Sequence, residues 1–167
     1  MLIVIRSMRE LHFGRLMDVY AQTNRDTAGE RWPSEPESHA VALAEQDFYN
    51  YLSACFFRTK GAIYFAWLES GRYFSALRLE PWRDGVLLEG LETAPERRNC
   101  GYACVLIRAV QAYLREQGIV KLYSHIRKRN LASVAVHEKC GFRKLYDHAV
   151  YADGSVDSRA GTYIYEA

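Results

Sequence analysis

The stretch LLEGLETAPERRNCGYACVL, residues 87–106, decides the fold of this 167-residue chain. Its first half is apolar and ends at Pro95, which has no N–H to donate to a sheet and therefore predicts the end of a strand. Its second half predicts a helix over 102–117, followed by Gly118 as a C-terminal cap. The apolar residues of this helix recur every three to four positions, at Tyr102, Val105, Leu106, Ala109, Val110 and Tyr113.

Between the two halves lies Arg98-x-x-Gly101-x-Ala103, residues 98–103, which we call the cradle. Its small residues let the backbone approach a ligand closely, and the first N–H groups of the following helix are free to bind an anion. Arg98 adds a positive charge beside them. The Walker pattern Gly-x-x-x-x-Gly-Lys-Ser/Thr is absent, and a dinucleotide fingerprint would need three glycines where this turn has one.

The cradle resembles the acyl-coenzyme-A loop of the GNAT N-acetyltransferase superfamily, whose members carry Arg/Gln-x-x-Gly-x-Gly/Ala after a strand that ends in a Pro-Glu-like turn. A second stretch, NLASVAVHEKCGF over residues 130–142, resembles the second signature of that family. The residues that match it in register are Asn130, Ser133, Glu138, Lys139, Gly141 and Phe142. One position departs, because His137 stands where the family commonly has Tyr.

The order of expected elements agrees with this resemblance. In the first half of the chain the pattern predicts a strand over 2–8, a helix over 9–24, a polar loop over 24–36, a helix over 37–56 and antiparallel strands over 62–68, 73–79 and 86–93. The helix over 102–117 follows, and then a strand over 120–126 that is expected to run parallel to the strand before that helix. A helix over 131–139 and a closing hairpin of 142–151 with 162–165 complete the expected order. Asn130 is expected to cap the short helix and Gly141 to end it.

The resemblance implies the GNAT fold, an α/β (α+β) arrangement with one mixed, mostly antiparallel twisted sheet of about seven strands and about four flanking helices. A chain of 19.2 kDa without repeats or a linker fits a single domain over residues 1–167.

Composition narrows the class of function. The net charge is +2, but residues 26–47 carry six acidic groups and one basic group, whereas residues 96–129 carry eight basic and two acidic groups. The basic half suits a polyanionic cofactor. The acidic segment suits a cationic acceptor, or is simply a solvated helix face. No signal peptide or membrane-spanning run is expected, so neither is a membrane partner, and no recognition motif for nucleic acid accompanies the basic residues.

The four cysteines form no Cys-x-x-Cys pair, which favours a reduced, cytoplasmic setting. Cys100 with Cys104, and His137 with Cys140, could be imagined as metal pairs. Each already has an explanation as a helix residue, so no metal site is expected.

The resemblance implies acetyl-coenzyme A as co-substrate. The backbone of Arg98, Asn99, Cys100, Gly101, Tyr102 and Ala103 is expected to bind the pyrophosphate, Thr93 the pantetheine arm, and Asn130 and Ser133 the cofactor from the second motif. A strand N–H near Leu91 or Thr93 is expected to polarise the thioester carbonyl. Arg127, Lys128 and Arg129 could reach the ribose phosphate or could be plain solvated surface.

The acceptor amine must lose a proton before it attacks, since an ammonium with a pKa of about 10.4 is not nucleophilic. Glu89 is the candidate base, directly or through water, because strand alternation would place it on the face of Leu91 and Thr93. The same alternation would place Glu92 on the opposite face, so Glu92 is not a candidate base. The alternative, an exposed or paired Glu89, stays open. Tyr123 and His125 on the next strand are further candidates that packing explains equally well.

His137 has two interpretations. The Tyr that it replaces is thought to protonate the departing thiolate, and a histidine with a pKa of about 6.5 could do the same. Alternatively, His137 fills the position and hydrogen-bonds backbone. Both interpretations stay open.

The resulting hypothesis is an N-acetyltransferase that acts on a primary amine, in particular a small cationic or amino-acid-like acceptor. The acidic residues near Trp32 that favour such an acceptor are Asp26, Glu30, Glu35 and Glu37. The alternatives are a protein or peptide N-acetyltransferase and a non-catalytic acyl-coenzyme-A-binding module on the same fold. The aromatic closing strands could support a homodimer.

Overall fold

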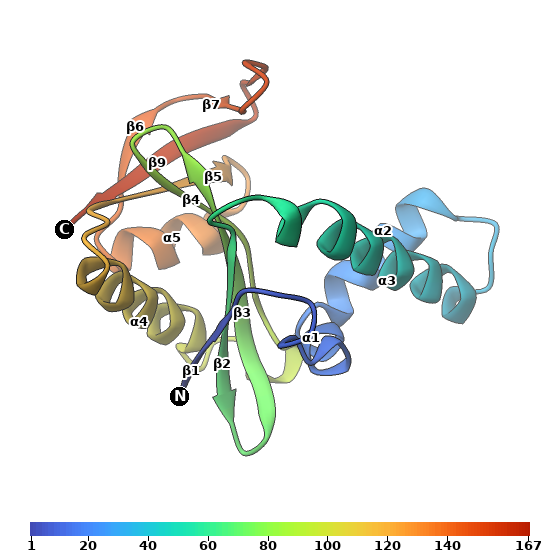
Figure 1. The fold of residues 1–167 in the computed structure, drawn as a ribbon. Helices are drawn as coiled ribbons and strands as arrows, with labels where there is room; N and C mark the ends of the chain where they lie inside the picture. Colours follow the sequence, from blue (N-terminus) through green and yellow to red (C-terminus); the bar gives the residue numbers. More distant parts are fainter.

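The computed structural model describes residues 1–167, and Figure 1 shows a twisted central sheet with helices on both of its faces. The strands of this sheet are β1 (Leu2–Ile5), β2 (Ile63–Glu69), β3 (Arg72–Trp82), β4 (Gly85–Thr93), β5 (Lys121–Arg127), β6 (Arg143–Tyr146) and β9 (Ala160–Glu166). The helices are α1 (Phe13–Val19), α2 (Ala21–Arg31), α3 (Glu37–Ala54), α4 (Tyr102–Glu116) and α5 (Leu131–Lys139), with 3-10 turns η1 (Phe56–Arg58) and η2 (Pro95–Arg97). None of these helices is both long enough and apolar enough to cross a membrane.

The strand order is β1-β2-β3-β4-β5-β9-β6, and every neighbouring pair is antiparallel except β4 and β5. The parallel pair follows from the path of the chain, because α4 returns it from the end of β4 to the start of β5. The predicted mixed, mostly antiparallel sheet of seven strands is confirmed. Five helices flank it, one more than expected.

The extra helix lies where a loop was predicted. Instead of one helix over 9–24 and a loop over 24–36, the chain forms α1 and α2, which meet at Tyr20. Because α2 is almost entirely polar, it carries no apolar period from which to predict it. Packing holds it instead, since Ala28 of α2 and Ala40 of α3 are buried and small side chains allow two helices to lie close together. The pair forms an arm that projects from the sheet (Figure 1).

The predicted closing hairpin forms, but of the expected strand over 142–151 only 143–146 pairs with β9. β6 pairs with β9, and β9 enters the sheet between β5 and β6. The residues between them form a two-stranded sheet of β7 (Ala149–Val150) and β8 (Val156–Asp157). This small sheet stands at the upper end of the molecule in Figure 1.

Each face of the main sheet has its own apolar core. The α4 face packs Phe65, Leu77, Leu79, Leu88, Leu106, Ile107, Val110 and Leu122. The opposite face, which we call the α1–α3 face, packs Leu16, Val19, Tyr20, Leu52, Phe56, Tyr64 and Ala66. Because side chains alternate along a strand, the face that a residue occupies decides which ligand it can reach.

β4 contains a β-bulge at Gly90. Glu89 pairs with Arg78 of β3, whereas Glu92 pairs with Ala76, so an advance of three residues along β4 opposes an advance of two along β3. Gly90 has φ +57°, a left-handed conformation that favours glycine. The extra residue reverses the alternation of side chains beyond it.

The bulge corrects one expectation. Leu91 packs with the core on the α4 face. Glu89 and Glu92 both lie on the α1–α3 face, where they pair with Arg78 and Ala76 of β3 respectively. The prediction that Glu89 shares a face with Leu91 and Thr93, and that Glu92 faces away from Glu89, is therefore wrong.

β4 and β5 are paired only over 86–88 and 122–124. Beyond Leu88 and Ser124 both strands continue without pairing to each other. We call this region the β4–β5 split. The facing edges of the two strands have no ladder partner along it, so their backbone groups are able to bond a ligand.

Candidate active site

One pocket of about 610 Å³ lies between the end of β4, the cradle, the first turn of α4 and α5, with α2 at one side. Of the residues predicted to contact acetyl-coenzyme A, its lining includes Leu91, Thr93, Arg98, Asn99, Gly101, Tyr102, Ala103, Asn130 and Ser133. The exposed Cys100 is not part of this lining. The fold thus brings the two sequence motifs together in one pocket.

The cradle leaves backbone N–H groups open. Gly101 is the N-cap of α4 with φ +84°, and no side-chain cap bonds the first turn of this fifteen-residue helix. Asn99 also has a positive φ of +60°, so the chain turns sharply before the helix. A Cβ added to Gly101 would meet no atom within 4 Å. An open helix N-terminus with its positive dipole end suits an anion such as a pyrophosphate.

Arg98 is linked to the arm through Glu92. The Arg98 Nη2 to Glu92 Oε2 distance is 3.7 Å, and Thr23 Oγ1 of α2 donates a hydrogen bond of 2.9 Å to Glu92 Oε1. Burial raises the pKa of Glu92, against the lowering effects of the Thr23 hydrogen bond and the Arg98 charge. Sequence reasoning missed this pocket-lining carboxylate. Gly90 inside a strand was the signal for the bulge that places it here.

The second motif begins α5. The Asn130 Oδ1 accepts a hydrogen bond of 3.1 Å from the backbone N–H of Ser133, which confirms the predicted helix cap. Both residues line the pocket, as does Lys139 at the other end of the helix.

His137 is buried and does not line the pocket. Its side chain is 1% exposed and packs edge-on against Phe142 at a ring-centroid distance of 4.9 Å. Its Nδ1 lies 2.8 Å from the carbonyl oxygen of Ser133, and Nε2 has no partner. Burial lowers the pKa of His137, although the Ser133 hydrogen bond opposes this. If Nδ1 carries the hydrogen donated to Ser133, the neutral ring has none to give at Nε2.

Glu89 contacts Arg78 rather than the pocket. The Arg78 Nη2 donates to Glu89 Oε2 at 3.3 Å, with side chains that are 18% and 29% exposed respectively. Tyr20 donates a hydrogen bond to the carbonyl oxygen of Gly90, and Tyr64 donates one of 2.7 Å to the Tyr20 hydroxyl. A Cβ on Gly90 would come within 2.5 Å of Arg78 Nη1. These contacts hold the bulge in place.

The two further candidates on β5 differ. The Tyr123 hydroxyl donates to Asp84 Oδ1 at 2.7 Å, and Lys121 donates to the other oxygen of that carboxylate. Tyr123 is therefore already engaged. His125, in contrast, has no hydrogen-bond partner at either ring nitrogen, although both nitrogens are buried.

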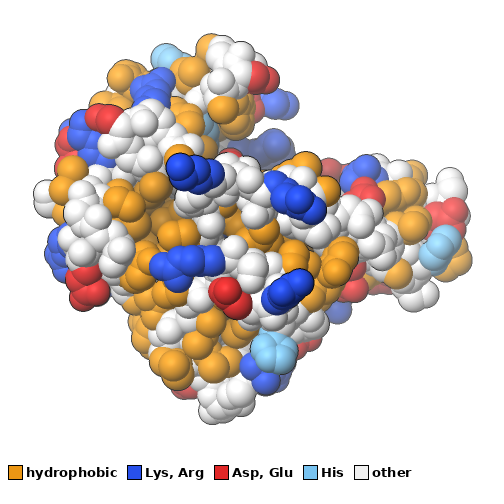
Figure 2. Space-filling view, in the orientation of Figure 1, with side chains coloured by type: hydrophobic (Ala, Val, Ile, Leu, Met, Phe, Trp, Pro, Cys, Tyr) orange, Lys and Arg blue, Asp and Glu red, His pale blue; other side chains and the backbone are white.

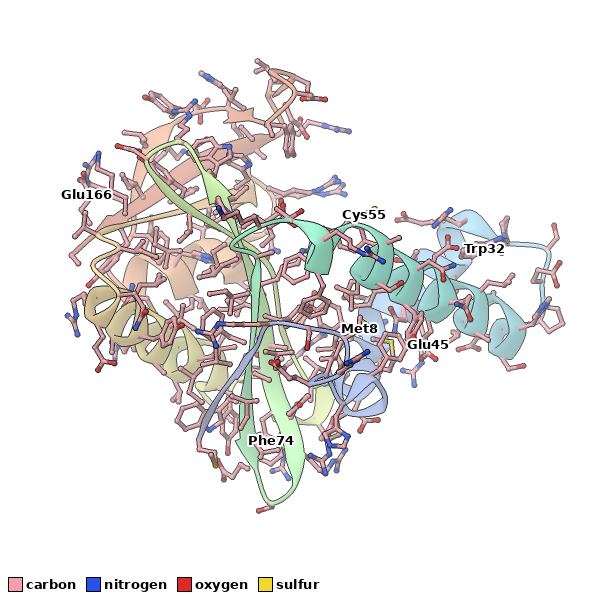
Figure 3. All side chains as sticks on the ribbon, viewed as in Figure 1. Met8, Trp32, Glu45, Cys55, Phe74 and Glu166 are labelled. Atoms are coloured by element: carbon pink, nitrogen blue, oxygen red, sulfur yellow. The ribbon has the colours of Figure 1, made fainter.

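Most of the acidic residues near Trp32 lie away from the pocket. Figure 3 shows Trp32 and Glu45 out on the arm, on the side of the molecule opposite Glu166. Within the arm, ion pairs join Glu37 to Arg25 and Asp47 to Arg31, and a hydrogen bond of 2.7 Å joins His39 to Glu35. Of the acidic set that favoured a cationic acceptor, only Asp26 lines the pocket.

The chain belongs to the acetyltransferase (GNAT) family, whose model matches residues 17–142. It is similar to aminoglycoside N(6′)-acetyltransferase type 1 of Serratia marcescens, with 30% identity over 112 residues, which are 66% of this chain and 77% of that relative. Family and relative identify an acyltransferase enzyme and agree with the resemblance seen in the two motifs.

Solved structures of low sequence identity share the fold. The PaiA N-acetyltransferase of Thermoplasma acidophilum, in complex with coenzyme A, matches with a TM-score of 0.64 and 11% identity over 100% of this chain and 99% of its own. A spermidine N-acetyltransferase SpeG variant of Vibrio cholerae gives 0.63 and 19% identity, and the ribosomal-protein-S18-alanine N-acetyltransferase of Escherichia coli gives 0.62 and 16%. Each of these two covers 99% of this chain and 94% of its own.

Proposed function

We propose that the protein transfers an acetyl group from acetyl-coenzyme A to a primary amine of a small cationic molecule, by direct attack within a ternary complex. The observation that carries this proposal is the open cradle at the N-terminus of α4, in one pocket with Thr93, Asn130 and Ser133. The relatives named for aminoglycoside and spermidine acetylation act on small molecules with several amines, which supports the same class of acceptor here.

The cradle fits the phosphates of acetyl-coenzyme A. Its backbone N–H groups and Arg98 would bind the pyrophosphate, and the strand edge at Leu91 and Thr93 would bind the pantetheine arm. A backbone N–H along the β4–β5 split would polarise the thioester carbonyl, as an oxyanion hole does. Asn130 and Ser133 would contact the cofactor from α5.

The acceptor is expected on the α1–α3 face, where Glu89 lies. Glu89 would assist loss of the ammonium proton, directly or through water, while Arg78 holds its Oε2 in place. For His137 we propose the structural alternative, in which the thiolate leaves without its help. The support is the burial of the ring and its hydrogen bond to Ser133.

We also propose that residues 1–167 act as one domain. The family match ends at residue 142, yet β6 and β9 complete the same sheet beyond it.

The test is a colorimetric assay of coenzyme A thiol release from acetyl-coenzyme A, with spermidine, kanamycin, free amino acids and short peptides as acceptors. We expect release that depends on the acceptor and is fastest with a small polyamine-like molecule. Release with peptides alone would move the acceptor to protein amines. Tight acetyl-coenzyme A binding without release for any acceptor would contradict the proposed transfer.

A further inference from the structure

His125 and Glu89 stand opposite each other at the start of the β4–β5 split. Leu88 and Ser124 form the last pair between the two strands, so Glu89 and His125 are the first residues beyond it. Leu88 and Leu122 belong to the core on the α4 face, and side chains alternate along each strand. Glu89 and His125 therefore both point to the α1–α3 face, the side from which an acceptor would reach the split.

The imidazole of His125 is held between two aromatic rings. Trp82 lies edge-on at a centroid distance of 5.3 Å and an angle of 87°, and Tyr151 lies edge-on at 5.3 Å and 82°. Neither aromatic ring forms a hydrogen bond with the imidazole nitrogens of His125, and both nitrogens are buried without a partner. A buried polar group without a hydrogen bond is costly, so each ring nitrogen is expected to bond a group from outside the chain, either water or a ligand.

The charges around His125 suit a proton acceptor. The groups that face it are Glu89 from β4, Arg83 from the turn between β3 and β4, and Tyr151 from the segment after β7, whereas its neighbour on β9 is the uncharged Thr162. Burial lowers the pKa of His125 from its ordinary 6.5, Glu89 opposes this and Arg83 adds to it. The ring is consequently neutral at pH 7, and a proton gained there would be stabilised by the Glu89 carboxylate.

The surface offers an approach to this side. Figure 2 shows an indentation between the end of the molecule that carries β7 and the projecting arm. β7, which Tyr151 follows in the chain, lies on one side of this indentation, and α3 of the arm lies on the other. The cofactor pocket lies between the end of β4, the cradle, α4 and α5, with α2 of the arm at one side, and its lining includes neither Glu89 nor His125.

We propose that His125 is the direct proton acceptor of the transfer and binds the acceptor ammonium at the β4–β5 split, which refines the role of Glu89 to stabilising the imidazolium that forms. An N–H bond of the ammonium breaks and its proton moves to a ring nitrogen of His125, which leaves a neutral amine and an imidazolium. The amine nitrogen forms a bond to the thioester carbonyl carbon, the C–S bond breaks, and the sulfur leaves with a proton from the attacking nitrogen. The imidazolium then loses its proton to water. This inference rests on the proposed acetyl transfer and adds a catalytic residue to it.

The test compares His125→Gln with the wild type and with His12→Gln, an exposed histidine before α1 that serves as the matched control. Glutamine keeps hydrogen-bonding capacity but cannot take the proton. With spermidine or kanamycin, whichever the wild type acetylates faster, we expect His125→Gln to lose about 100-fold or more in kcat/KM. The affinity for acetyl-coenzyme A and the melting temperature should stay close to those of the wild type, as should every property of His12→Gln.

The pH profile separates proton transfer from simple binding. The wild-type kcat/KM should fall as the pH drops below 6.5, because a protonated His125 cannot accept a proton, and this acidic limb should disappear in His125→Gln. In His125→Ala, added imidazole should restore part of the rate.

Two results would overturn the inference while leaving the acetyl transfer intact. One is a His125→Gln rate within threefold of the wild type. The other is a loss confined to KM with the acidic limb unchanged, which would make His125 a binding contact only. A wild type without any acceptor-dependent release would instead contradict the proposed function, and this inference with it.

Discussion

The two sides of the β4–β5 split are built in different ways. On the cofactor side, the cradle uses backbone N–H groups that follow from one turn and the start of one helix, with Gly101 at the junction. On the side where we propose that the acceptor binds, Glu89, Arg78 and His125 come from three strands, and their faces depend on strand register. A local turn can build an anion site by itself, whereas a site made of side chains needs every strand in register.

The largest effect should come from breaking the bulge. In Gly90→Ala the new Cβ would collide with Arg78 and Tyr20 in addition to adopting a positive φ. We expect a loss of about 2–5 kcal/mol in the free energy of unfolding by urea, the sum of left-handed strain and overpacking. Gly71→Ala, with φ +76° and no atom within 4 Å, is the matched control and should lose only about 1–2 kcal/mol. Equal losses would contradict the role of these contacts.

The next effect concerns the cofactor side alone. Arg98→Ala removes the side-chain charge beside the cradle, and a charge-assisted hydrogen bond to phosphate contributes about 1.5–3 kcal/mol. Because Arg98 is nearly half exposed, we expect the lower end, about a tenfold weaker Kd for coenzyme A by calorimetry. Arg115→Ala, at the exposed end of α4, should leave the Kd unchanged. Similar values for both variants would place the pyrophosphate elsewhere.

Glu92 lies between Arg98 of the cradle and Thr23 of the arm. We expect its charge to affect the free energy of unfolding rather than the affinity for coenzyme A. Burial raises its pKa, so ionisation is less favourable in the folded chain than in the unfolded one. Ionised Glu92 therefore lowers the free energy of unfolding. This loss of stability is complete above the folded-state pKa of Glu92 and absent below its unfolded-state pKa of about 4.5. Relative to the wild type, Glu92→Gln should gain stability as the pH rises from 4 to 7, measured as the free energy of unfolding by urea. A constant difference across this range would contradict the prediction.

The smallest effect on turnover is expected at His137. His137→Phe should keep kcat within threefold, because the ring is buried and donates to Ser133 rather than to the pocket. Stability supplies a second readout. The unfolded chain takes up a proton at His137 near pH 6.5 and the folded chain resists it, so acidification below 6.5 destabilises the wild type more than the variant. A 100-fold fall in kcat with unchanged cofactor affinity would instead identify His137 as the general acid.

Much of this molecule could be predicted because its signals are local. The strand that ends before Pro95, the helix from Tyr102, the cap at Asn130 and the glycine at Gly101 each act within a few residues of chain. The same local features identify the cradle and the second motif in the sequence. In the structure, residues of both motifs line one pocket.

The rest depended on contacts between distant residues. α2 has no apolar period of its own and lies against α3, with Ala28 buried. The position of Glu92 depended on a bulge that Tyr20 and Arg78 stabilise from other elements. His125 and Tyr123 were equal candidates in the sequence, and only the structure separated them, because Tyr123 bonds Asp84 whereas His125 has no partner. Such features follow from register and tertiary packing, which single-sequence periodicity does not encode.

The central proposal is that the cofactor and the acceptor bind on different sides of the β4–β5 split. Its most direct test is a two-step NMR titration of the isotope-labelled wild type. Coenzyme A should first shift the backbone amides of Gly101, Ala103 and Ser133. Spermidine or kanamycin, added to this complex, should then shift the imidazole signals of His125 and leave the cradle amides in place. An acceptor that perturbs the cradle and leaves His125 unchanged would contradict the account.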